Sequence, residues 1–271
     1  MSETDRSRPP DRCTRSAGGD RRDARDDPSG GPAAPPDDGV VVASSAKEWA
    51  DAKRWNPFNS DKLLAQAARW KRIIRGRPLP VPTLVSIDPT NSCNLDCAWC
   101  NSEWILSRNS GRSLSAKVMT GIPRFLASWR SEDPWPFTVE AVCVGGGGEA
   151  LLNPHTDALI EECAANGIQA GVVTNGILLD RHIEALSLCT WVGVSVDAGS
   201  AVTFKRLKGL PETADTFDRV VKGVEKLAEY ARGTRCPLGG NGQGNGVSFK
   251  YLVHPENARE IHAAARIARD V

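Results

Sequence analysis

Apolar and polar positions follow two rhythms between residue 83 and the end of the chain. Short apolar runs predict strands at residues 83–88, 138–144, 168–174, 191–197 and 247–253. Between them, apolar residues recur at every third or fourth position, which predicts helices at 115–129, 155–166, 180–188, 213–231 and 257–270. Five strand–helix repeats indicate an α/β fold with a parallel sheet and crossover helices. Periodicity alone leaves a barrel and a doubly wound sheet both open.

The first 80 residues differ from this pattern. Residues 1–45 are rich in Asp, Arg, Gly and Pro, and we expect a disordered tail because they can bury little apolar surface. Residues 46–80 predict a helical N-terminal appendage that ends at a proline-rich break. Its helically spaced apolar positions are Leu63, Leu64, Ala67, Ala68 and Ile74. The core domain is therefore expected at residues 81–271.

Composition narrows the class of protein. The 34 Lys and Arg nearly cancel the 33 Asp and Glu, so no long-range field favours nucleic acid or anionic membranes. No apolar run reaches the roughly 20 residues that span a bilayer, and no secretory signal is seen. We therefore expect a cytoplasmic protein without nucleic-acid or membrane partners. Eight cysteines then favour metal ligands, reactive thiols or core residues over disulfides.

Three cysteines, Cys93, Cys97 and Cys100, fall within eight residues directly after the first predicted strand. Parallel α/β folds bind ligands beyond the carboxyl ends of their strands, and a loop this tight can point three thiolates at one soft-metal site. Three thiolates leave one iron of a cubane cluster open, whereas a structural zinc site needs four ligands. Thiols without metal remain an alternative. Zinc with a distant fourth ligand also stays open, the candidates being Cys143, Cys163 and His155.

The C-x3-C-x2-C spacing, with Trp99 before the last cysteine, resembles the signature of the radical S-adenosylmethionine (radical SAM) superfamily. Three more segments match in the family's order. The run Gly145-Gly-Gly-Gly-Glu149 follows the second strand and resembles the family motif that contacts the methionine amino group. Thr174-Asn175-Gly176 closes the third strand, and Ser195-Val-Asp197 ends the fourth where the family has a ribose-contacting polar pair. The resemblance covers residues 83–271.

The matched residue types suit these roles. Gly146, Gly147 and Gly148 let the backbone approach a ligand closely, and Glu149 can neutralise an ammonium group. For Asn175, a simple turn and a binding role are both open. Ser195 and Asp197 are two positions apart on a predicted strand. We therefore expect both to face the same side of the sheet, where they suit the hydroxyls of a ribose.

The resemblance implies a partial (β/α) TIM-like barrel with a [4Fe–4S] cluster on Cys93, Cys97 and Cys100. It also implies S-adenosylmethionine on the open iron, a peptide or small-molecule substrate, and an electron donor protein. The expected reaction is reductive cleavage of S-adenosylmethionine to a 5′-deoxyadenosyl radical that abstracts hydrogen from the substrate. No catalytic residue is separable from the cluster ligands.

The chain carries about five β-α units, fewer than the family's barrel, so we expect a core that is incomplete at its C-terminus. The strand at 247–253 would then be an edge strand, and a partner chain could complete the barrel. A non-catalytic or truncated iron–sulfur accessory protein is the alternative function. Outside the motifs, His254 and the remaining cysteines of the core are expected to be structural.

Overall fold

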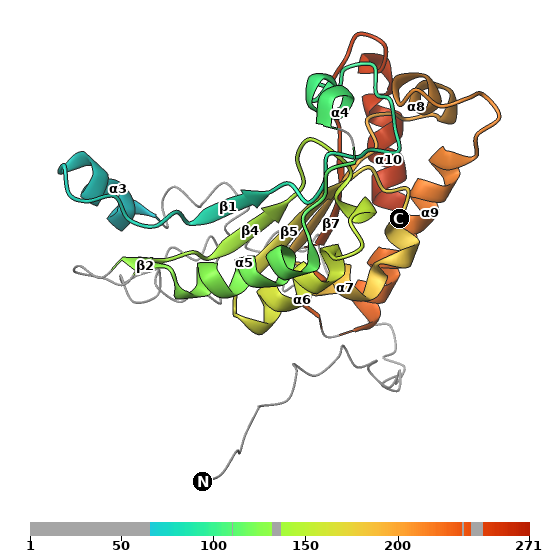
Figure 1. The fold of residues 1–271 in the computed structure, drawn as a ribbon. Helices are drawn as coiled ribbons and strands as arrows, with labels where there is room; N and C mark the ends of the chain where they lie inside the picture. The colour runs from blue at the N-terminus through green and yellow to red at the C-terminus, as the bar shows by residue number, and fades with distance from the viewer. Residues whose placement is uncertain (1–65, 110, 132–136, 235, 240–245) are drawn as a thin grey trace, which may run out of the picture.

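The computed structural model describes residues 66–109, 111–131, 137–234, 236–239 and 246–271. Its centre is a five-stranded parallel sheet in the order β1-β4-β5-β6-β7 (Figure 1). The five strands lie side by side in the same order in which they occur along the chain. In a doubly wound sheet, by contrast, this order reverses at one point. The predicted α/β class is confirmed, and the order is that of a partial barrel. The strands are β1 Leu84–Ile87, β4 Ala141–Val144, β5 Gln169–Thr174, β6 Trp191–Ser195 and β7 Gly246–Lys250.

Helices cover one face of this sheet. Along that face lie α5 Ala116–Ser128, α6 Thr156–Ala165, α7 Ile183–Ser187 and α9 Thr216–Gly233, and α10 Ile261–Asp270 follows β7 (Figure 1). The helices bury alternate strand residues such as Val142, Val172 and Val194, which are fully inaccessible. Within the described ranges, every helix is too short or too polar to cross a membrane.

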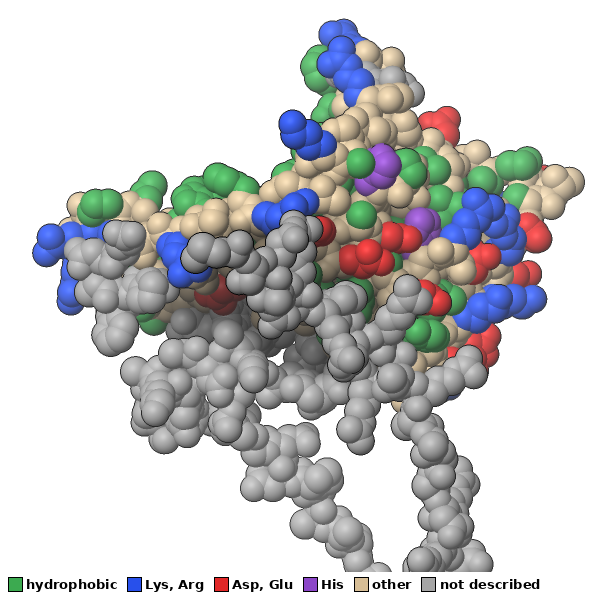
Figure 2. Space-filling model, turned by 60° about the horizontal axis from the view of Figure 1, so that its bottom comes forward, with side chains coloured by type: hydrophobic (Ala, Val, Ile, Leu, Met, Phe, Trp, Pro, Cys, Tyr) green, Lys and Arg blue, Asp and Glu red, His purple; other side chains and the backbone are tan. Residues whose placement is uncertain are grey.

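The intervening strand residues point to the other face, which is more open. Cys143, Val173 and Trp191 are only half-buried there, and Ser86 is exposed. The two faces therefore differ as expected for a barrel wall with helices outside it. On the side of the molecule shown in Figure 2, acidic and basic side chains are interspersed, in line with the balanced composition.

The strand predicted at 138–144 is wrong in one respect, because it forms two elements. Phe137–Thr138 (β3) pairs with Arg130–Ser131 (β2) in a separate antiparallel ribbon, and β4 starts only at Ala141. Between them, the N–H groups of Glu140 and Ala141 both donate to the carbonyl of Thr83, at 2.9 and 3.1 Å. Two residues thus oppose one, which interrupts the ladder as a bulge does.

Other predicted boundaries shift as well. The strands predicted to 197 and 253 end at Ser195 and Lys250, because the following residues fold into loops. The helix predicted at 180–188 is a 3-10 turn, η2 Leu179–Arg181, followed by α7, and the one at 257–270 is η4 Ala258–Glu260 followed by α10. Elements that the pattern did not predict are α4 Glu103–Asn109, α8 Ala201–Leu207, η1 Ala150–Leu152 and η3 Pro237–Gly239.

The N-terminal appendage contributes α3 Ala67–Ile74, which Arg69 anchors to the core. The Arg69 side chain is buried, and its Nη2 donates to Glu140 Oε1 at 2.9 Å and to the Thr138 carbonyl at 2.7 Å. Its guanidinium also lies 4.7 Å from the centre of the Phe137 ring. The proposed tail at 1–45, the start of the appendage and residues 240–245 lie outside the described residues. The division into tail, appendage and core stays a prediction.

We predict that Arg69→Met destabilises the protein by about 3–5 kcal/mol, because it leaves the largely buried Glu140 carboxylate without its cation. Chemical denaturation would measure the loss. Arg124→Met is the matched control, since the Arg124–Glu162 pair is longer, 3.5 Å, and exposed. The control should cost less than about 1 kcal/mol. Equal effects of the two substitutions would contradict the anchoring role.

A second prediction concerns Glu260, which joins α10 to the start of α8. Burial acts to raise its pKa, but hydrogen bonds from Thr203, Gly199 and Ser200 outweigh burial and lower the pKa below 4.5. A lowered pKa stabilises the fold at neutral pH, and this contribution is lost as pH falls through the folded-state pKa. Glu260→Gln should therefore lower the melting temperature near neutrality, by an amount that shrinks below pH 4.5. A difference independent of pH would refute this linkage.

Candidate functional site

The loop that carries the three cysteines, residues 93–100, follows β1 and lies across the carboxyl ends of the neighbouring strands. Just before it, the Ser92 carbonyl accepts from Glu149 N at 2.8 Å, beyond β4. Within it, Asp96 N donates to the Lys208 carbonyl at 3.2 Å, and Ala98 N donates to the Leu207 carbonyl at 3.0 Å. The loop is therefore held from both sides by backbone hydrogen bonds rather than by regular structure.

The three thiols are free and accessible to differing degrees. Cys93 is exposed, and Cys97 and Cys100 are half-buried. Burial raises the pKa of Cys93 and of Cys97, whereas the nearby charge of Lys208 acts to lower the pKa of Cys97. The negative charges of neighbouring thiolates also raise the pKa of Cys93 and of Cys97. A bound cation would relieve that repulsion, so metal binding here should release protons.

The donor set fits an iron–sulfur cluster. In the part of the chain that the structure describes, no three His, Cys, Asp or Glu side chains form a site for a single metal ion. Zn–S bonds of about 2.3 Å would bring thiolates to about 3.8 Å from one another. A cubane separates them further, because each thiolate binds a different iron. The three thiols supply three of the four ligands that a cubane needs.

The glycine run after β4 packs tightly against the segment that leads into the cysteine loop. A Cβ atom on Gly148 would lie 2.4 Å from the carbonyl oxygens of both Thr90 and Ser92. A Cβ on Gly146 would overlap the Asp88 carboxylate at 1.6 Å. At Gly147 the nearest atom would be 3.8 Å away, which is an ordinary contact. Backbone packing therefore requires glycine at Gly148, whereas a side chain at Gly146 would need the exposed Asp88 carboxylate to move aside.

Glu149 joins the ends of β4 and β5 through a carboxylate that is 3% exposed. Its Oε1 accepts from Thr174 Oγ1 at 2.6 Å and Leu151 N at 3.1 Å, and its Oε2 accepts from Asn175 N at 2.7 Å. Burial raises its pKa, and the hydrogen bonds from Asn175 and Thr174 oppose that rise. Three of about four acceptor positions are used, so one is left for an ammonium group. Its role in binding methionine stays a prediction.

Asn175 connects the end of β5 to the cysteine loop. Its Nδ2 donates to Asn94 Oδ1 at 2.7 Å, and its Oδ1 accepts from Ile177 N at 3.0 Å. The side chain therefore shapes the turn and supports the loop at the same time. The structure brings Asn175 to the predicted site, and contact with a ligand stays a prediction.

Ser195 and Asp197 do not share a strand as expected. Strand β6 ends at Ser195, and Asp197 adopts a left-handed φ of 57°, so the alternation of faces does not extend to it. The Asp197 carboxylate is buried and accepts from Lys208 Nζ and from Leu252 N, each at 2.6 Å. Ser195 remains half-buried at the strand end. A ribose-binding role stays a prediction for both residues.

The pattern of the sequence did not single out Lys208, because α8, which ends just before it, was not predicted. Its ammonium group is buried, 5.8 Å from the ring centre of Trp99 and 5.9 Å from that of Phe204. The available signal was the next residue, Gly209, whose φ of 67° and close approach to the Asp96 carbonyl favour glycine. His254, expected to be structural, lies 5.1 Å from Trp99, ring centre to ring centre.

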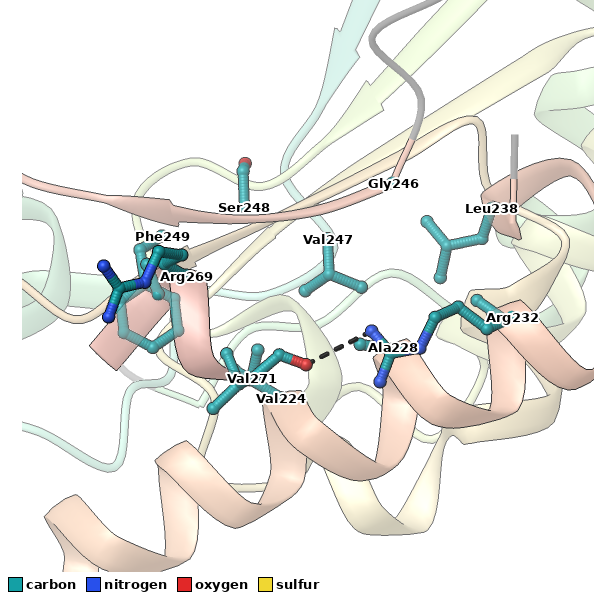
Figure 3. Close-up of a pocket in the computed structure, with 12 residues that line it drawn as sticks. Val224, Ala228, Arg232, Leu238, Gly246, Val247, Ser248, Phe249, Arg269 and Val271 are labelled. Atoms are coloured by element: carbon teal, nitrogen blue, oxygen red, sulfur yellow. Dashed lines mark hydrogen bonds between the residues drawn. The ribbon is translucent and has the colours of Figure 1, made fainter. Parts of the chain in front are cut away.

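A pocket of about 490 Å³ lies elsewhere, between α9, β7 and the end of α10 (Figure 3). Val224 and Val247 point into it, and Arg232 closes one side by donating to the Val271 carbonyl at 3.2 Å. None of the predicted site residues lines this pocket. It marks the open edge of the described sheet rather than the cysteine site.

Comparison of this sequence with protein-family models and with curated proteins points to one superfamily. A family model described as the Radical SAM superfamily matches residues 87–266. A probable GTP 3′,8-cyclase of Methanosarcina acetivorans is 27% identical over 152 residues, which cover 54% of this chain and 42% of the relative. An AdoMet-dependent heme synthase of Methanosarcina barkeri is 26% identical over 155 residues, covering 54% of this chain and 39% of the relative. The chain thus spans less than half the length of these curated relatives.

The fold also matches a solved structure. Streptococcus suis SuiB bound to S-adenosylmethionine superposes with a TM-score of 0.54 at 18% identity, covering 77% of this chain and 43% of that chain. At this identity the match supports the partial barrel and not a shared substrate.

We predict that Gly148→Ala prevents normal assembly of the site, because its methyl group would collide with two backbone carbonyls. Iron and sulfide content after anaerobic reconstitution should fall by more than half, and the melting temperature should drop. Gly147→Ala, with no contact closer than 3.8 Å, should match the wild type in both measurements. The packing argument fails if both variants behave alike.

Proposed function

This chain belongs to the radical SAM superfamily, and from that premise we propose that it is an enzyme that abstracts hydrogen from a peptide or small molecule. The superfamily's cofactors are a [4Fe–4S] cluster and S-adenosylmethionine. When bound, the cluster supplies one electron to the sulfonium, so that the carbon–sulfur bond breaks to give methionine and a 5′-deoxyadenosyl radical. The observation that carries the proposal is a loop with three free thiols whose leading segment, Thr90 and Ser92, packs on Gly148 after β4.

Cys93, Cys97 and Cys100 would hold the cluster, and the protein offers three thiolates so that one iron stays open. Their accessibility allows loading from solution, and the raised pKa values of Cys93 and Cys97 mean that loading displaces protons. Partly exposed thiols stay reduced in the cytoplasm, where we place the protein.

The residues around the loop would orient S-adenosylmethionine. We assign the methionine end to the backbone of Gly146, Gly147 and Gly148, with the remaining acceptor position of Glu149 on the ammonium group. Because the Glu149 carboxylate is already held by three donors, it would need no reorganisation on binding.

The nucleoside would lie toward the ends of β5 and β6. Ser195 is half-buried there, and Asn175 supports the cysteine loop through its hydrogen bond to Asn94. Asp197 would contact the ribose only in addition to its present partners. Trp99, between Lys208 and His254, would shield the cluster side of the site from water.

The substrate class rests on the relatives. The names of the curated relatives concern small molecules, a GTP cyclase and a heme synthase. SuiB, in contrast, is also known in a structure with its precursor peptide SuiA. Either class could reach the open face of the sheet, where Trp191 and Cys143 are half-buried. A donor protein would supply the electron.

A second candidate, a non-catalytic cluster-binding accessory protein, is favoured by the edge of the sheet. Strand β7 has only β6 as a neighbour in the described sheet, and the pocket beside it is lined by apolar side chains together with Arg232 and Arg269. An added strand that pairs with β7 would cover this edge in either case. Formation of 5′-deoxyadenosine separates the two candidates, since an accessory protein would form none.

We predict that the anaerobically reconstituted protein, reduced with dithionite, gives a cluster EPR signal that shifts when S-adenosylmethionine is added. Cys97→Ala should abolish the signal and reduce 5′-deoxyadenosine to background, because the cluster loses one of three ligands. Cys236→Ser is the control, since Cys236 contacts Thr234 at 3.0 Å and lies outside the loop. A wild-type protein that takes up zinc or no metal would rule out the proposed enzyme.

A further inference from the structure

We propose that the buried ion pair between Lys208 and Asp197 is the device that positions the cysteine loop, with Lys208 as a positioning residue for the cluster. This inference rests on the proposed function of the loop. It concerns two residues from different elements, the end of α8 and the segment after β6.

The pair is well sequestered from water. Lys208 Nζ lies 2.6 Å from Asp197 Oδ2, and the two side chains are 3% and 6% exposed. Burying both charges is costly, so the pair is stable only where geometry and further hydrogen bonds compensate. Such a pair contributes little to stability, and its place beside the cysteine loop suits a role in specifying geometry.

On one side, the backbone at Lys208 holds the loop directly. The carbonyls of Leu207 and Lys208 accept from Ala98 N and Asp96 N, at 3.0 and 3.2 Å. These two amides flank Cys97, so the position of that thiol depends on where α8 ends. The ion pair ties that end of α8 to the segment after β6.

On the other side, Asp197 connects to the segment after β7. Its Oδ1 accepts from Leu252 N at 2.6 Å, and its carbonyl accepts from Asn257 Nδ2 at 2.8 Å. Asn257 in turn accepts from His254 N at 2.7 Å, and the His254 ring packs on Trp99. The contacts form a closed circuit that begins and ends on the cysteine loop.

The charge of Lys208 also faces the loop. Its ammonium group lies 5.8 Å from the Trp99 ring centre and 2.6 Å from Asp197 Oδ2. A cluster that gains an electron becomes more negative, and a nearby cation favours that state. Removing the cation leaves the buried Asp197 charge uncompensated, which disfavours reduction further.

The test compares Lys208→Met, Lys208→Arg and Asp197→Asn with Lys226→Met, a change at an exposed lysine of α9. In the metal-free proteins, hydrogen exchange would be followed at the amides of Asp96 and Ala98. Lys208→Met should speed that exchange by about tenfold or more while amides of β5 stay protected. Lys208→Arg should restore much of the protection, and Lys226→Met should change nothing.

The second readout is the midpoint potential of the reconstituted cluster, followed by EPR. Lys208→Met should shift it to more negative values, and Lys208→Arg should lie near the wild type. Asp197→Asn should speed exchange in the loop yet shift the potential in the opposite direction, because it removes an anion. A merely structural pair would give the same sign of shift for both charge-removing variants.

Unchanged exchange and potential in Lys208→Met would overturn the inference. If Lys208→Met also loses hydrogen-exchange protection in β5, the variant has unfolded globally and Asp197→Asn becomes the test. Loss of protection in β5 of Asp197→Asn would also overturn the inference. Failure of the wild type to load a cluster would refute the proposed function. Hydrogen exchange in the metal-free loop would still test whether the Lys208–Asp197 pair positions that loop.

Discussion

The cysteine loop must satisfy its backbone polar groups without a helix or strand of its own, and the surrounding structure is arranged around that requirement. Its donors and acceptors find partners after β4, after β5 and at the end of α8. Asn94 bonds to Asn175, and Asp96 bonds to Lys208. Because parallel strands in sequential order bring their carboxyl ends to one edge, these partners are available in one place. Moving any of the partner segments would break these hydrogen bonds and release the loop from the strand ends.

Buried charge is the second organising feature of this edge. Glu149, Asp197 and Lys208 are each nearly inaccessible, and each is compensated by short, directed contacts. Glu149 links two strand ends through uncharged donors, whereas Asp197 and Lys208 compensate each other. A charge fixed in this way has low reorganisation cost, which suits a site that must hold a charged cofactor. The same contacts make the site sensitive to single substitutions.

The sheet is asymmetric in how its strands are covered. The inner strands carry residues with no exposure at all on their helix side, but every residue of β7 retains some exposure. The pocket between α9, β7 and α10 lies at the same edge, well apart from the cysteines along the chain. Stability in the described part therefore depends on β4, β5 and β6. The edge at β7, like the opposite edge of the described sheet at β1, is open to an added strand.

The sequence by itself determined the five strands and most of their helices. Burial on one face of each element imposes a regular spacing of apolar residues along the chain. It also identified the cysteine loop and the glycine run, since three thiols at this spacing and a run of glycines are chemically distinctive. Only the tertiary structure decided which residues support them. Lys208 follows a seven-residue helix too short to show a period, and the left-handed turn at Asp197 depends on partners 11 and 55 positions away. Such contacts leave no local pattern, because the two ends of each bond meet only after the sheet has formed.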